Sequence, residues 1–164
     1  MYRGDEFQLK LPVEGALREV IYIKSLLKSV KGLDVRMSIG IGEEVYTGNG
    51  VSESNGSAYQ RSGRTLDALK SAKTNLAITS GDVVIDKTLN LMLKLALDFM
   101  DSWSVVSAEI VGIVLKNPEV SQKEIAKQLG VQQSAVSQRY TRARLDLVLD
   151  VLQYYKEICK EIKE

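Results

Sequence analysis

Residues 121–140 read Ser121-Gln-Lys-Glu-Ile-Ala-Lys-Gln-Leu-Gly-Val-Gln-Gln-Ser-Ala-Val-Ser-Gln-Arg-Tyr140, and this stretch decides the fold of the C-terminal half of the chain. Apolar residues recur at helical spacing in two sets, first Ile125, Ala126 and Leu129 and then Ala135 and Val136. Gly130 lies between the sets, and glycine adopts the left-handed conformation that ends a helix without steric cost. The pattern predicts two short helices joined by a tight turn, a helix-turn-helix.

The second predicted helix, from Gln132 to Leu145, is polar and basic and contains no acidic residue. When such a motif binds DNA, its second helix enters the major groove, where Gln, Ser and Arg side chains reach base edges or phosphates. The residues predicted to make these contacts are Gln132, Gln133, Ser134, Ser137, Gln138, Arg139 and Arg142. Arg139 stands where an apolar residue often packs, so we expect Tyr140 to pack instead. The alternative is an ordinary helical hairpin inside an all-α bundle.

The composition excludes several classes of protein. The 164 residues suffice for one domain or two small ones, and the net charge of +1 requires any DNA-binding surface to be local. The chain has no histidine, which removes His-based catalytic triads and most zinc sites, and we expect no enzymatic activity. The single cysteine, Cys159, fits a reducing compartment, and no signal peptide or membrane-spanning run is visible. We therefore expect a cytoplasmic protein.

The first half of the chain alternates the patterns of strands and helices. Apolar residues alternate with polar ones over residues 7–11, which predicts a half-buried strand. The elements predicted after it are a helix from Pro12 to Gly32, a strand over residues 34–42, a helix over 57–73 and a strand over 76–78. This order predicts a small α/β sandwich in residues 1–80, followed by an all-α domain in residues 81–164.

The second half is predicted to contain helices over residues 83–100 and 104–116 ahead of the helix-turn-helix. Its second helix is expected to continue without a break to the C-terminus. Apolar residues recur along that tail at alternating steps of three and four: Leu145, Val148, Leu152, Tyr155, Cys159 and Ile162. Such a heptad seam indicates contact with another helix, most simply in a homodimer.

Asp5 and Glu6 suggest a different function. Adjacent carboxylates supply the oxygen ligands that Mg²⁺ prefers, so a metal-dependent nucleotide-binding or nucleotide-processing protein is one alternative. The simpler interpretation is a pair of solvated acids in a turn, because two adjacent carboxylates do not make a Mg²⁺ site by themselves. A protein-interaction adaptor, whose helices never meet DNA, is the other alternative.

Two regions of the chain resemble the SatD family of bacterial proteins. The first contains Arg3-Gly-Asp-Glu-Phe-Gln8, the strand pattern Asp34-Val-Arg-Met-Ser-Ile-Gly-Ile-Gly42 and Asn55-Gly-Ser-Ala-Tyr59. The second contains Phe99-Met-Asp-Ser-Trp103 and the helix-turn-helix. Both occur in the family's order, and the resemblance implies a layout more than a reaction.

The N-terminal part also resembles the GGDEF and nucleotide-cyclase fold, a ferredoxin-like palm, through Gly4-Asp5-Glu6-Phe7. This resemblance implies an α+β class: a partial ferredoxin-like α/β sandwich followed by an all-α helix-turn-helix domain. Arg3 replaces the first glycine of the turn, and the upstream metal-binding strand of such enzymes has no counterpart here. A sheet that begins at Glu6 has a bare edge, which again favours a homodimer. We expect a transcriptional regulator that binds double-stranded DNA, with an N-terminal part that dimerises or senses a ligand.

Overall fold

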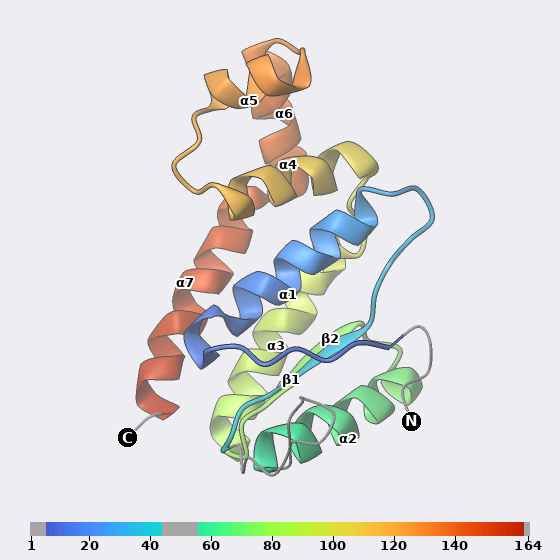
Figure 1. Ribbon diagram of the computed structural model, residues 1–164, viewed down its shortest axis with the longest axis vertical. Helices are drawn as coiled ribbons and strands as arrows, with labels where there is room; N and C mark the ends of the chain where they lie inside the picture. Colours follow the sequence, from blue (N-terminus) through green and yellow to red (C-terminus); the bar gives the residue numbers. More distant parts are fainter. Residues whose placement is uncertain (1–5, 44–55, 163–164) are drawn as a thin grey trace.

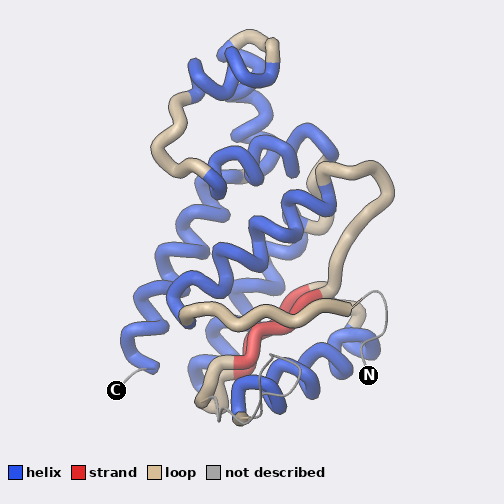
Figure 2. The backbone as a smooth tube through the Cα atoms, viewed as in Figure 1, coloured by secondary structure: helices blue, strands red, loops and turns tan. Residues whose placement is uncertain are grey.

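A computed structural model describes residues 6–43 and 56–162 of the chain. The elements in these ranges (Figure 1) are α1 (Val13–Lys28), β1 (Met37–Gly40), α2 (Ser57–Ala72), β2 (Leu76–Thr79), α3 (Val83–Met100), α4 (Val105–Lys116), α5 (Gln122–Leu129), α6 (Gln133–Ala143) and α7 (Leu145–Ile162). Helices dominate the molecule and one small sheet lies in its lower half (Figure 2).

The sheet of the described residues consists of β1 and β2, which run parallel with Met37 opposite Leu76 and Gly40 opposite Thr79. Helix α2 packs on one face of β1, and α1 and α3 lie on the other side of the sheet. Gly40 permits the close approach of α2, because a Cβ there would lie 2.1 Å from the carbonyl oxygen of Ala58.

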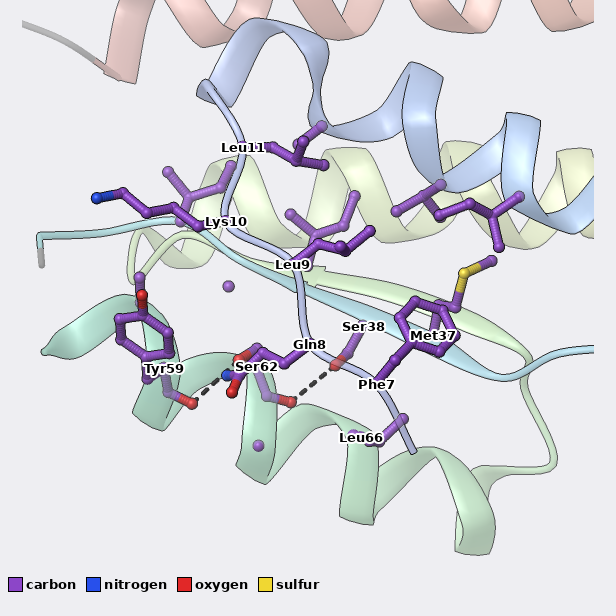
Figure 3. A pocket seen from close by; sticks show the side chains of 18 of the residues that line it. Phe7, Gln8, Leu9, Lys10, Leu11, Met37, Ser38, Tyr59, Ser62 and Leu66 are labelled. Carbon is purple, nitrogen blue, oxygen red and sulfur yellow. Dashed lines mark hydrogen bonds between the residues drawn. The ribbon is translucent and has the colours of Figure 1, made fainter. Parts of the chain in front are cut away.

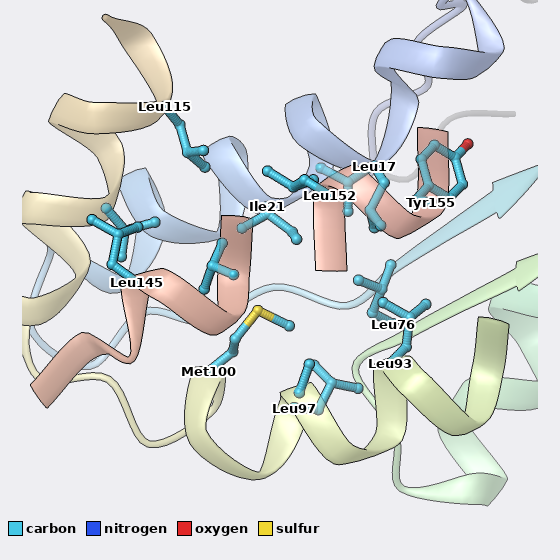
Figure 4. Close-up of a cluster of buried hydrophobic side chains, with 14 of the residues drawn as sticks. Leu17, Ile21, Leu76, Leu93, Leu97, Met100, Leu115, Leu145, Leu152 and Tyr155 are labelled. Atoms are coloured by element: carbon cyan, nitrogen blue, oxygen red, sulfur yellow. The ribbon is translucent and has the colours of Figure 1, made fainter. Parts of the chain in front are cut away.

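One hydrophobic core joins both halves of the chain (Figure 4). It contains side chains from α1, β2, α3, α4 and α7, including Leu17, Ile21, Leu76, Leu93, Leu97, Met100, Leu115, Leu145, Leu152 and Tyr155. Helix α1 packs against both α4 and α7, and α3 packs against α7. The phenol of Tyr155 donates a hydrogen bond of 2.7 Å to the carbonyl of Val13, and burial raises the pKa of this tyrosine. The N-terminal and C-terminal segments are thus parts of one packed body.

The predicted fold class is wrong. The described residues form a mostly helical structure with a two-stranded parallel sheet, and neither a ferredoxin-like sandwich nor a separate all-α domain is present in them. Residues 7–11 lie extended without joining the sheet, and Phe7 and Leu9 remain 54% and 55% exposed. The alternation of apolar and polar residues predicted a strand here, and that prediction is wrong: residues 7–11 pair with neither β1 nor β2. The predicted boundary at residue 80 falls in the turn between β2 and α3.

The heptad seam of the C-terminal tail is buried within the chain. Five of its residues are buried and Ile162 packs at the margin of the core. The seam faces α1 and α3 rather than a second copy, since α7 packs on both helices. It therefore no longer argues for a homodimer.

A cluster of charges lies where α1, α3 and the start of β1 meet. Lys24 is 1% exposed, and its ammonium group lies 2.7 Å from an oxygen of Asp34 and 2.6 Å from an oxygen of Asp101. Lys28 donates a 2.6 Å hydrogen bond to the backbone carbonyl of Asp101. The side-chain amide of Asn75 donates a 3.1 Å hydrogen bond to the carboxylate of Asp101. A buried lysine is stable only when paired, and here two carboxylates supply the pairing.

Candidate nucleic-acid interface

Helix α5 begins at a capping box. The Ser121 hydroxyl accepts a hydrogen bond from the Glu124 amide at 3.2 Å, and the Glu124 carboxylate accepts from the Ser121 amide at 2.8 Å. The Ser121 hydroxyl also donates to this carboxylate at 2.6 Å, and these bonds hold the pKa of Glu124 below its ordinary value. Two amides that a helix start leaves unpaired are thereby satisfied.

Gly130 ends α5 in the left-handed conformation, with φ at +64°. The amide of Val131 bonds to the carbonyl of Ala126 at 3.0 Å and turns the chain back. Ile125 on α5 and Val136 on α6 are fully buried. The geometry predicted for two short helices with a tight turn at Gly130 is therefore present.

Helix α6 turns one polar face to solvent. The predicted residues on this face or at the start of the helix are Gln132, Gln133, Ser134, Ser137, Gln138 and Arg142, and all are exposed. Within the described part of the chain, none of these six side chains forms a hydrogen bond or an ion pair. Thr141 shares the face, and its hydroxyl donates to the Ser137 carbonyl at 3.2 Å.

Arg139 lies apart from the other predicted residues. Its side chain is 20% exposed and its guanidinium group lies 3.2 Å from a carboxylate oxygen of Glu109 on α4. It thus lies on the side of α6 that packs against α4, next to the buried Val136. Tyr140 is partly buried on the same side, in agreement with its expected packing role, and burial raises its pKa.

The prediction that the second helix continues to the C-terminus is wrong. Arg144 adopts a left-handed conformation with φ at +51° and separates α6 from α7. The indole of Trp103 donates a buried hydrogen bond of 2.9 Å to the carbonyl of Ala143, and the guanidinium of Arg144 lies 6.0 Å from the centre of the Phe99 ring. Contacts from the end of α3 and from the turn after it therefore meet the chain where α6 ends.

Positive charge concentrates on these two helices. Residues 121–144 contain five basic residues and one acid, a net charge of +4 in a chain of net charge +1. Lys123 and Lys127 on α5 are exposed, and neither lies in an ion pair with another described residue. The predicted DNA contacts did not include these two lysines or Thr141. The helical spacing of Lys123 and Lys127 around the apolar Ile125, and of Thr141 one turn after Ser137, could have indicated that they are exposed.

The metal-site prediction gains no support from the described residues. Asp5 lies outside them, and Glu6 is exposed. Across residues 6–43 and 56–162, no three His, Cys, Asp or Glu side chains lie close enough together to hold a metal ion. Bound Mg²⁺ or nucleotide remains an untested prediction.

Comparison with models of known protein families identifies the family of the chain. The model of the SatD family matches residues 1–158, nearly the whole sequence. The chain belongs to the SatD family. The residues that suggested SatD, from the N-terminal Gly-Asp-Glu-Phe run to the helices after Trp103, all lie inside the matched range. No curated protein and no solved structure matches this SatD family member. None of the helices in its described ranges combines the length and apolarity needed to cross a bilayer.

Proposed function

We propose that α5 and α6 form a helix-turn-helix that binds double-stranded DNA, and that the protein acts in the cytoplasm as a transcriptional regulator. The observation that carries the proposal is the exposed face of α6, where the side chains of Gln133, Ser134, Ser137 and Gln138 have no partner within the described part of the chain. Such groups cost little to leave in water and gain hydrogen bonds when base edges approach.

The charges of the region fit the same partner. Lys123, Lys127 and Arg142 are exposed cations around the polar face, suited to phosphates. No side chain caps the first turn of α6, so its amide groups are available to a phosphate oxygen. Arg139 supports the face from behind through its pair with Glu109 and is not proposed as a DNA contact.

The composition of this face disfavours a protein-interaction adaptor. Interfaces between proteins depend on buried aromatic and large apolar residues. The exposed side of α6 carries Gln133, Ser134, Ser137, Gln138 and Arg142 and no apolar side chain. It lacks the residues around which protein partners pack.

A homodimer forms part of the proposal, through α3. Val84, Leu91 and Leu95 on the outer side of this helix are 73%, 61% and 67% exposed. Their spacing of seven and four residues makes one apolar stripe, the kind of helix surface that a partner covers. A second copy supplies an identical stripe, and a dimer would present two copies of α6 to two half-sites of DNA.

The test is a titration of labelled duplex DNA, followed by fluorescence anisotropy at several salt concentrations. With three exposed cations on phosphates, the logarithm of the binding constant should fall by about 3 per tenfold rise in salt for each copy. Arg142→Ala should weaken binding and reduce this slope by about 1 per copy. Binding without salt dependence, or no binding at all, would refute the proposal.

A matched control separates a local effect from a general loss of charge. Arg64 is exposed on α2, at the opposite end of the molecule from α6 (Figure 1). Arg64→Ala removes the same charge and should leave affinity and salt slope unchanged. Equal losses in Arg64→Ala and Arg142→Ala would show that α6 is not the DNA reader.

A further inference from the structure

A groove of about 750 Å³ runs beside β1 at the level of the sheet (Figure 3). Helix α1 walls it on one face, α2 walls it on the other, and the extended residues 6–11 close its far side. Phe7 lies beside Met37, and Gln8 turns toward Ser62 of α2. The groove therefore lies where an additional strand of the sheet would lie, between β1 and residues 6–11.

The backbone edge of β1 opens into this groove. The Met37 amide donates to the carbonyl of Asn75, just before β2, and the Ile41 amide donates to the carbonyl of Thr79, the last residue of β2. Both hydrogen bonds are 2.9 Å long. Because alternate residues of a strand direct their backbone groups to opposite sides, Ser38 and Gly40 direct theirs away from β2. No described residue supplies a backbone partner to Ser38 or Gly40 on that side. These are the unpaired groups that a further strand satisfies.

The two walls of the groove differ in chemistry. On the α1 side the lining residues are apolar: Val13, Ala16, Val20 and Ile23. On the α2 side they are mainly small or polar: Ala58, Tyr59, Ser62 and Gly63. Successive side chains of a strand point to opposite faces. A strand in the groove would thus place apolar side chains toward α1 and small or polar ones toward α2.

The charges at the groove are mixed: Glu6 lies with Lys10 and Arg36, and Asp34 is already paired with Lys24 and Lys28. An occupant of strong net charge of either sign would meet repulsion from part of this lining, so a nearly neutral occupant fits best. A small apolar ligand would leave the backbone groups of Ser38 and Gly40 unpaired. Only an extended peptide satisfies the edge and both walls together.

We propose that this groove binds an extended, nearly neutral peptide segment of a partner polypeptide, which adds to the sheet as a strand along β1. A segment of about five residues spans the edge from Met37 to Ile41 at about 3.3 Å per residue. Its side chains alternate between large apolar residues, which contact α1, and small or polar ones, which contact α2. The site is independent of the DNA surface on α5 and α6.

The test uses labelled synthetic peptides with the full chain. One peptide alternates Val and Ser over five residues, a second has the same composition with the Val residues grouped together, and a third has Pro at the centre. The alternating peptide should bind one per chain and slow hydrogen exchange at the Ser38 and Gly40 amides. The grouped and Pro peptides should bind at least about tenfold more weakly, a change of about 1.4 kcal/mol. Equal binding of all three would overturn the proposal.

Two glycine variants localise the binding. A Cβ at Gly63 meets nothing within 4 Å, so Gly63→Trp should fold and place an indole in the groove. Gly15 also has open space around it but does not line the groove, so Gly15→Trp is the matched control. Peptide binding should be lost in the first variant and kept in the second; loss in both or in neither would overturn the proposal. If the protein is a dimer and either Gly63→Trp or the peptide dissociates it, the occupant of the groove is a second copy of the chain. That result would also overturn the proposal.

Discussion

The indole Nε1 of Trp103 donates a 2.9 Å hydrogen bond to the backbone carbonyl of Ala143, forty residues further along the chain. The last carbonyls of a helix lack partners within the helix. Trp103 is 5% exposed, so it supplies one of these partners out of contact with solvent. The turn after α3 thereby caps the last turn of α6, next to the break at Arg144 that precedes α7.

Trp103→Phe should keep an aromatic ring in the core and remove only the donor. The Ala143 carbonyl would then be buried without its partner, which costs about 1–3 kcal/mol of unfolding free energy. Urea denaturation followed by circular dichroism measures the loss. Faster hydrogen exchange in the last turn of α6 should accompany it, and wild-type exchange there would show that other contacts end the helix.

The pair of Arg139 and Glu109 should stabilise the packing of α6 on α4. Their side chains are 20% and 42% exposed, so solvent screens the pair and its coupling should be about 0.2–1 kcal/mol. A double-mutant cycle with Arg139→Ala and Glu109→Ala in urea denaturation gives this value. Strictly additive effects of the two substitutions would mean that Arg139 does not hold α6 through Glu109.

Gly40→Ala should destabilise the protein. The new Cβ would lie 2.1 Å from the Ala58 carbonyl oxygen and 2.5 Å from the Ser62 amide, both backbone atoms that move only if α2 moves. Overpacking of this kind costs about 1–3 kcal/mol. Thermal unfolding measures it.

Gly63→Ala is the matched control for that substitution. It makes the same chemical change inside α2, where the added methyl group meets nothing within 4 Å. Alanine is favoured over glycine in a helix, so stability should rise by about 0.5–1 kcal/mol. A similar loss in both variants would indicate that glycine is needed in these elements for another reason.

Asp34 should make stability depend on pH in the acid range. Burial by itself would raise the pKa of its carboxyl, but the hydrogen bonds from Lys24 and the Val35 amide, with the charges of Lys24 and Lys28, outweigh this and lower it. A carboxyl with a lowered folded-state pKa stabilises the fold fully above its ordinary value of 3.8 and loses that contribution as the pH falls through the folded-state pKa. Thermal unfolding between neutral pH and pH 3 should show the loss, and it should be smaller in Asp34→Asn.

Local patterns predicted the helices well, because their apolar periodicity and caps lie in short stretches of sequence. The start of α5 follows from Ser121 and Glu124, and its end follows from Gly130. The helix predicted over residues 83–100 has the observed bounds of α3, with Asp82 accepting hydrogen bonds from two amides of its first turn.

Features that depend on distant contacts escaped prediction. Nothing in the sequence near Arg144 marks a helix end, and the contacts found there come from Trp103 and Phe99 in another part of the chain. The ion pair of Arg139 with Glu109 could not be predicted, because the two residues lie thirty positions apart and meet only through the packing of α6 on α4. Alternation at residues 7–11 encodes a chain with two unlike faces, but it does not supply the neighbour with which a strand must pair.

Helix α1 has a practical consequence for the preparation of a minimal DNA-binding fragment. It covers both α4 and α7, and Val13 provides the acceptor for the buried Tyr155 hydroxyl. A fragment cut after residue 80 would expose the apolar side of α7, including Leu152, to water and leave that hydroxyl without its acceptor. Such a fragment should aggregate rather than bind DNA, so crystallisation or footprinting of this interface requires a chain that retains α1.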